Sequence, residues 1–158
     1  MTREEKQQFT LRISQANATQ LVVILYEMLL SYLNEAENML ESGKNLEFHE
    51  AVRKARGCLN ELLQSLNLQY EPAPTLRQLY LFCIRRLAIG EAKEEEAPLG
   101  EIKRVINPLW DAYARIAVQN SAGPVMENSQ AVYAGLTYGR NTLTENMTDQ
   151  GANRGMYV

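Results

Sequence analysis

Apolar residues recur every three or four positions in four separate stretches of the chain, a spacing that places them on one face of an α-helix. The first stretch runs from Leu21 to Met39, the second from Leu46 to Leu66, the third from Leu76 to Leu87, and the fourth from Leu99 to Ala117. With their flanking residues, these stretches predict helices over about residues 18–42, 46–68, 76–89 and 98–119.

Local signals mark the ends of the first two helices. The Asn17 side chain can accept a hydrogen bond from a free backbone N–H of the first turn, and the Gln20 side chain can reach back to Asn17. This pair therefore predicts a capped helix start. Gly43 predicts the end of the same helix. Only a short turn separates it from the second helix, which makes the two antiparallel neighbours.

Prolines and glycines set the expected limits of the last two helices. We expect Tyr70–Pro74 to be extended, because proline restricts the residue before it, and Thr75 to cap the third helix. Gly90 is expected to end that helix before a solvated acidic turn, Glu91–Glu96. Pro98 suits a first helical turn. Pro108 lies inside the fourth stripe and predicts a kink or break there.

Four helices with short loops predict an all-α fold, with an antiparallel up-and-down four-helix bundle over residues 17–119. No strand pattern competes for these residues. The character of the chain changes after residue 119: residues 120–158 hold five of the nine glycines and many Asn, Ser and Thr residues. This composition predicts a flexible C-terminal tail and not a second domain.

Composition and charge narrow the class of protein. The chain has 158 residues, of which 46% are hydrophobic and 22% charged, as in ordinary single domains with a packed core. The net charge of -3 lacks the excess of positive charge that is typical of proteins that bind nucleic acid. The apolar run Leu21–Leu30 contains Glu27 and is too short to span a bilayer, and the first residues do not resemble a secretory signal. We therefore expect a cytoplasmic protein without membrane insertion.

The inventory of reactive groups is thin. His49 is the one histidine, and Cys58 and Cys83 lie among apolar residues, where a reduced thiol behaves as a small hydrophobe. We expect no disulfide, no metal site, no cofactor and no enzymatic activity. The open alternative is a histidine phosphotransfer bundle that uses His49, although Glu50 beside it would repel a phosphoryl group.

Four segments in order resemble the flagellar secretion chaperone FliS family. They are Asn17–Tyr26 at the start of the first helix, Arg53–Ala55 with Leu59 and Leu62, Tyr80 with Arg85–Leu87, and Asp111–Tyr113. The sequence departs from the family pattern at Ala18, where proline is frequent, at Phe9, which replaces a tyrosine, and at Gly90 and Pro108.

The resemblance implies a chaperone that binds the C-terminal segment of flagellin in an apolar groove, prevents premature polymerisation and hands it to a flagellar export gate component. Residues 1–16 would form an N-terminal cap segment over this groove, with Phe9, Leu11 and Ile13 covering it or acting as a fixed hydrophobic staple. The groove residues would be Tyr26, Leu29, Leu30, Leu33, Tyr80 and Ile84. Arg85 and Arg86 would anchor partner carboxylates or brace the bundle through Glu residues.

Three questions stay open from the sequence. The apolar and aromatic run Val132–Tyr138 could dock on the chain's own groove or on another partner, or its aromatics could be incidental to a disordered tail. A generic helical adaptor with a different partner fits the same pattern. A homodimer is neither indicated nor excluded.

Overall fold

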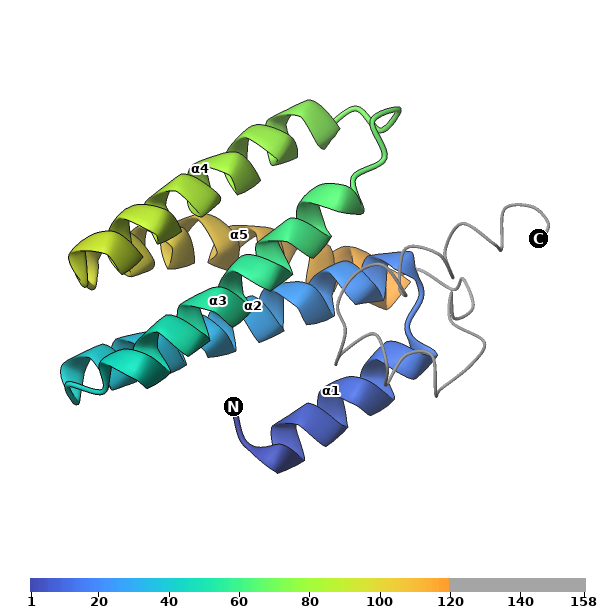
Figure 1. The fold of residues 1–158 in the computed structure, drawn as a ribbon. Helices are drawn as coiled ribbons and strands as arrows, with labels where there is room; N and C mark the ends of the chain where they lie inside the picture. Colours follow the sequence, from blue (N-terminus) through green and yellow to red (C-terminus); the bar gives the residue numbers. More distant parts are fainter. Residues whose placement is uncertain (120–158) are drawn as a thin grey trace, which may run out of the picture. The chain divides into compact units, whose positions relative to one another are not determined.

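The structure, a computed structural model, describes residues 1–119. These residues form five helices and no strand: α1 (Arg3–Gln15), α2 (Ala18–Glu41), α3 (Asn45–Gln64), α4 (Ala73–Lys93) and α5 (Ala97–Gln119) (Figure 1). The all-α class is therefore confirmed for the described residues. The prediction of a flexible tail over 120–158 falls on residues outside them.

The chain divides into two compact units. Unit 1 contains Met1 and Leu25–Ala112, and unit 2 contains Thr2–Ile24 together with the residues from Tyr113 onward. The helices α2 and α5 each contribute to both units, since their residue ranges cross the two boundaries.

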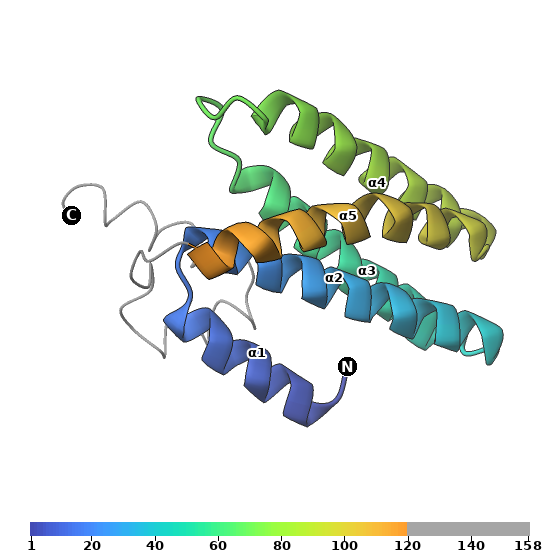
Figure 2. The same ribbon diagram turned by 180° about the vertical axis from the view of Figure 1, so that it is seen from behind.

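In unit 1, the connections between α2 and α3 and between α4 and α5 lie at one end, and the longer connection between α3 and α4 lies at the other (Figure 2). The helices α3 and α4 pack against each other. Side chains that are at most 1% exposed fill this unit, among them Phe48, Val52, Leu59, Leu62, Leu87, Leu99, Ile102 and Ile106. These are apolar positions at helical spacing, so burial of the predicted faces holds this unit together.

The predicted signals at both ends of α2 are confirmed. The Asn17 side chain accepts from the backbone N–H of Gln20, and the Gln20 side chain accepts from the backbone N–H of Asn17, both at 2.9 Å. At the other end, Gly43 adopts the left-handed conformation with φ of 71°. Its backbone N–H donates to the carbonyl of Leu40, and that of Lys44 donates to the carbonyl of Met39, which satisfies carbonyls that the helix leaves open.

The predicted start of α4 is wrong. The helix begins at Ala73, with Pro72 as its N-cap residue, so Tyr70–Pro74 is not extended throughout and Thr75 is not the cap. Pro74 is accommodated because the first backbone N–H groups of a helix have no intrahelical partner to lose. The preceding helix, α3, ends at Gln64 and not at 68; four residues beyond, the side chain of Leu68 is 72% exposed.

The predicted end of α4 is also wrong. The helix continues through Gly90 and ends at Lys93, and the C-cap residue, Glu94, adopts the left-handed conformation with φ of 53°. Gly90 has a packing role instead: a Cβ there would lie 3.3 Å from the Cβ of Pro98, at the start of α5. Glu91 is therefore a helical residue, and it is paired with His49 and Arg56 instead of being free in a solvated turn.

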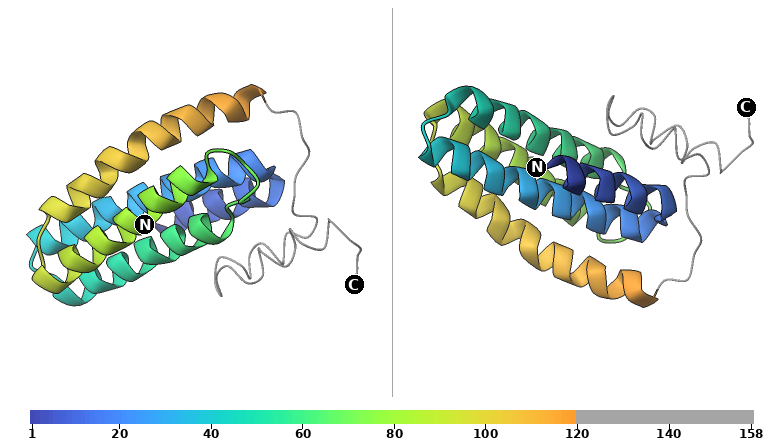
Figure 3. Two further views of the ribbon diagram at one scale, coloured as in Figure 1. Left: turned by 90° about the horizontal axis from the view of Figure 1, so that it is seen from above. Right: turned by 90° about the horizontal axis from the view of Figure 1, so that it is seen from below.

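Of the two outcomes expected at Pro108, a kink or a break, the break does not occur. The helix α5 includes Pro108 and runs on to Gln119 (Figure 3). Proline removes the hydrogen bond to the carbonyl four residues earlier, that of Arg104. Both residues are exposed, so water can satisfy this carbonyl.

Unit 2 contains a helix where the sequence analysis placed only a cap segment. Thr2 caps α1, because its hydroxyl accepts from the N–H of Glu5 at 3.1 Å and its own N–H donates to the Glu5 carboxylate at 2.7 Å. These backbone and side-chain hydrogen bonds with Thr2 lower the pKa of Glu5. In the same unit, Ile13, Ala16 and Ile24 are buried.

Candidate partner-binding surfaces

The groove residues predicted on α2 and α4 fall into two sets. Tyr26, Leu29, Leu33 and Tyr80 are at most 1% exposed and belong to the core of unit 1. The two phenol oxygens of Tyr26 and Tyr80 are 2.5 Å apart and form a buried hydrogen bond between α2 and α4. Leu30 and Ile84, in contrast, are only half-buried. These two are the side chains of the set that a partner reaches without separating helices.

The two arginines of α4 differ in their surroundings. Arg86 donates from Nη2 to the carboxylate of Glu101 on α5 at 2.7 Å, and both side chains are about three-tenths exposed. This contact joins α4 to α5, which is one of the two roles predicted for the pair. Arg85 is exposed on the same helix.

His49 lies in a polar cluster between the start of α3 and the end of α4. Its Nδ1 is 3.2 Å from a carboxylate oxygen of Glu91, and its Nε2 is 3.4 Å from one of Glu94. Arg56 donates to the other Glu91 oxygen at 2.5 Å. Burial raises the pKa of Glu91, but the hydrogen bonds from Arg56 and His49 lower it by more, so the net shift is downward.

This cluster weakens the phosphotransfer alternative. A phosphoryl group on either nitrogen of His49 would lie beside a carboxylate, either Glu91 or Glu94. Like charges at that distance repel, so neither nitrogen is a favourable acceptor. The side chain of His49 is 43% exposed, and the histidine acts here as a link between two helices.

The three residues predicted for the N-terminal cap all lie on α1. Ile13 is 2% exposed, Phe9 is half-buried and Leu11 is 60% exposed. The guanidinium of Arg12 lies 5.6 Å from the centre of the Phe9 ring, a cation–π contact. One side of this helix is therefore packed while Leu11 faces solvent.

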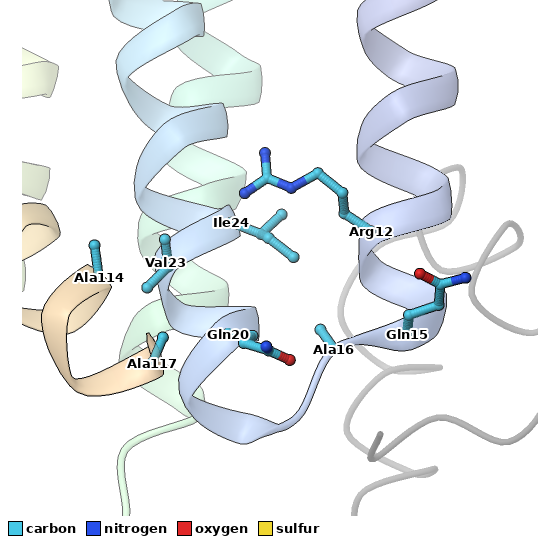
Figure 4. Close-up of a pocket in the computed structure, with 8 residues that line it drawn as sticks. All are labelled: Arg12, Gln15, Ala16, Gln20, Val23, Ile24, Ala114 and Ala117. Carbon is cyan, nitrogen blue, oxygen red and sulfur yellow. The ribbon is translucent and has the colours of Figure 1, made fainter. Parts of the chain in front are cut away.

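A cleft of about 350 Å³ opens within unit 2, and the sequence analysis did not foresee it. Its walls come from the end of α1, the start of α2 and the end of α5 (Figure 4). Ala16, Val23, Ile24, Ala114 and Ala117 supply apolar walls, and Arg12, Gln15 and Gln20 supply polar groups. We call this feature the unit 2 cleft.

The second half of α5 exposes apolar side chains, two of which the sequence pattern placed in the fourth stripe. Of these two, Trp110 is 36% exposed and Ile116 47%; Val118, beyond the stripe, is 87% exposed, while Leu99, Ile102 and Ile106 in the first half are fully buried. The periodicity of the apolar residues is the same along the whole helix, so the spacing alone could not show where burial stops.

The described part of the chain offers no reactive thiol, no cluster of metal ligands and no helix suited to span a membrane. Cys58 and Cys83 are buried free thiols, and burial raises the pKa of each to about 12. Residues 1–119 hold no group of three His, Cys, Asp or Glu side chains placed to bind a metal ion. Among the described helices, none combines the length and the hydropathy that a membrane span requires.

Residues 1–119 define an all-helical domain with an open cleft and with exposed apolar side chains on α5. Comparison with known families identifies the family. The model of the family described as flagellar protein FliS matches residues 1–120, and the chain belongs to this family. The flagellar secretion chaperone FliS of Bacillus subtilis (strain 168) is 24% identical over 108 residues, which cover 68% of this chain and 80% of the relative.

Proposed function

We propose that this protein is a cytoplasmic flagellar secretion chaperone that binds the C-terminal segment of flagellin, prevents its premature polymerisation and hands it to the export gate. The observation that carries the proposal is the family match over residues 1–120. The described fold is compatible with this role, because α2 and α4 offer apolar side chains close to the surface. A segment that is unstructured alone can fold against such helices, and the cost of ordering it keeps the complex reversible.

In this proposal the helices α2 to α5 form an antiparallel four-helix bundle, and flagellin docks on the faces of α2 and α4. Leu30 and Ile84 are the first contacts, since both are half-buried. Tyr26, Leu29, Leu33 and Tyr80 support these contacts from below, because they are buried in the free protein. Arg85 is exposed and is the arginine suited to a carboxylate of the partner, whereas Arg86 already bonds to Glu101.

The helix α1 has the proposed role of a cap that flagellin displaces. It has 13 residues and only one fully buried side chain, Ile13. Because only this side chain is buried, little packing is lost when α1 moves away. Isolated helices shorter than about 12–15 residues are marginal in water, so the displaced segment can also unfold. This supports a mobile cap, while the Thr2–Glu5 capping box keeps the segment helical when it is docked.

Calorimetric titration with the C-terminal segment of flagellin from the same source tests the proposed function. We expect one-to-one binding with a negative heat-capacity change, the marker of apolar burial. Ile84→Asp should weaken binding about tenfold or more, since a charge at a half-buried apolar contact must be desolvated. Thr75→Asp adds the same charge at an exposed position of α4, nine residues earlier and therefore on the opposite side of the helix, and serves as the matched control.

Two results would overturn the proposal. The absence of binding by the full chain would remove flagellin as the partner and leave a helical adaptor with another ligand. Equal losses for Ile84→Asp and Thr75→Asp would mean that added charge alone weakens the complex, and that the side of α4 that carries Ile84 is not the contact.

A further inference from the structure

Apolar side chains continue from the unit 2 cleft along the last turns of α5. Ala114 and Ala117 line the cleft. Val118 is four residues beyond Ala114, and residues with this spacing lie on the same side of a helix. Because Val118 is 87% exposed, the apolar surface extends past the cleft toward the end of the helix. Figure 4 shows the two alanines facing Val23 of α2 across the opening.

The chain itself supplies a segment next to this surface. Residues 120–158 follow directly after Gln119, two residues from the cleft-lining Ala117. The family match ends at residue 120, so this segment is an addition to the family domain. Its sequence is largely polar, and Val132–Tyr138 is an apolar and aromatic run within it.

We propose that the segment Val132–Tyr138 binds in the unit 2 cleft of the same molecule. Leu136 can enter between walls made of Val, Ile and Ala side chains, because both are apolar. Tyr133 and Tyr138 combine an apolar ring with a hydroxyl, which suits a cleft whose polar groups are Arg12, Gln15 and Gln20. The cleft volume of about 350 Å³ accommodates a few side chains and not a whole helix.

The covalent link makes a weak contact sufficient. The residues between Gln119 and Val132 span up to about 40 Å when extended, which exceeds the distance needed to return to a cleft beside Gln119. A tether of this length holds the segment near the cleft at an effective concentration on the order of 1 mM, so a contact with a Kd of about 0.1 mM would be roughly nine-tenths occupied. The proposal concerns the protein alone and does not depend on flagellin binding.

Hydrogen exchange on the full-length protein tests the proposal from the side of the tail. Leu136→Asp should accelerate exchange about tenfold in peptides that cover residues 12–24 and 112–119, because the cleft loses its occupant. Leu143→Asp makes the same substitution seven residues later and should leave both peptides unchanged. Unchanged exchange in Leu136→Asp, or equal acceleration by the two variants, would overturn the proposal.

Photocrosslinking tests it from the side of the cleft and identifies the occupant. With benzoyl-phenylalanine in place of Tyr133, we expect crosslinks within one molecule to residues 12–24 or 113–119. Ala117→Glu should reduce their yield at least fivefold, whereas Ala112→Glu, at an exposed position outside the lining, should not. Crosslinks between two copies, or to other regions of the chain, would overturn the proposal and show that the segment binds a second copy or another site.

Discussion

Two helical glycines show how closely individual residues control packing. A Cβ at Gly90 on α4 would lie 3.3 Å from the Cβ of Pro98 and 3.4 Å from the carbonyl oxygen of Glu95. A Cβ at Gly57 on α3 would have no neighbour within 4 Å. Gly90 therefore permits a close approach of α5, while Gly57 only adds backbone freedom that folding must remove.

The same substitution should consequently have opposite effects at the two positions. We expect Gly90→Ala to lower the free energy of unfolding by about 1–2 kcal/mol through overpacking. Gly57→Ala should raise it by about 0.5–1 kcal/mol, because alanine is the better helix former. Urea unfolding of the two variants measures both changes. A neutral Gly90→Ala variant would contradict the packing role of that glycine.

Glu91 is the residue whose charge should matter most in the polar cluster between α3 and α4. Its pKa lies below its ordinary value of 4.5, since hydrogen bonds from Arg56 and His49 outweigh the opposing effect of burial. Folding therefore stabilises the ionised carboxylate of Glu91 relative to the unfolded chain. The contribution of this carboxylate to the free energy of unfolding is complete above the pKa it has in the unfolded chain. The contribution is lost as the pH falls through the lower pKa of the folded protein.

Replacement of this carboxylate should give a pH-dependent loss of stability. We expect Glu91→Gln to reduce the free energy of unfolding by about 1–2 kcal/mol at pH 7, as for other charged hydrogen bonds. The difference from the unmodified protein should shrink as the pH falls below 4.5. Denaturant unfolding between pH 3 and pH 7, roughly the range in which carboxylates titrate, measures it, with the exposed Glu95→Gln as control. A difference that grows with acidity would contradict the assigned sign.

At the scale of helices, the capping box of α2 lies within unit 2, where the chain passes from α1 into α2. Asn17 is 2% exposed and exchanges two hydrogen bonds with Gln20. We expect Asn17→Ala to lower the free energy of unfolding by about 1–2 kcal/mol, while Asn17→Ser, which retains an acceptor, should recover most of it. Thermal or urea unfolding compares the two. Equal losses would show that burial of the side chain matters and the cap does not.

The role of α1 as a displaceable cap gives a second prediction for a single helix. Ile13→Ala should weaken the packing of α1 and raise the affinity for flagellin about threefold or more, because less packing is lost on displacement. Leu11→Ala removes a side chain that is 60% exposed and should leave the affinity unchanged. Calorimetry measures both. An affinity that falls for Ile13→Ala would identify α1 as part of the binding surface and not as a cap.

Helix limits could be predicted where the signal was local and failed where it depended on packing. The Asn17 and Gly43 signals act within one turn, and both were correct. Gly90 is typical of a helix end in the sequence, yet in the structure its missing side chain allows Pro98 to approach closely. Only the tertiary structure reveals this contact. The helix α1 was missed because its apolar residues are few, although Thr2 and Glu5 form the capping-box pattern that could have indicated it.

At the scale of the whole molecule, the same limit applies to the binding surface. The first apolar stretch covers more than one face of α2, so the sequence could not separate Leu29, which is fully buried, from Leu30, which is half-buried. It could equally not show that α5 is buried at Ile102 and exposed at Val118. Periodicity fixes which residues share a face, whereas the number and position of neighbouring helices decide which faces are covered.

Because Leu29 is fully buried and Leu30 is half-buried, the two adjacent residues allow effects on stability and on binding to be tested separately. Leu29→Ala should lower the free energy of unfolding by about 2–5 kcal/mol, the usual range for a buried leucine. It should change the affinity for flagellin less than about twofold under the surface-docking proposal, because the partner does not touch a fully buried side chain. Leu30→Ala should do the reverse, with a stability loss below about 1 kcal/mol and an affinity loss of about fivefold or more.

Urea unfolding and calorimetry on the same two preparations measure both quantities. An affinity loss for Leu29→Ala as large as that for Leu30→Ala would mean that flagellin reaches a side chain that is fully buried in the free protein. Such contact requires α2 to separate from its neighbours, and the buried hydrogen bond between Tyr26 and Tyr80 would then have to break on binding. Hydrogen exchange in α2 and α4 would accelerate in the complex in that case, whereas docking on the intact surface protects both helices.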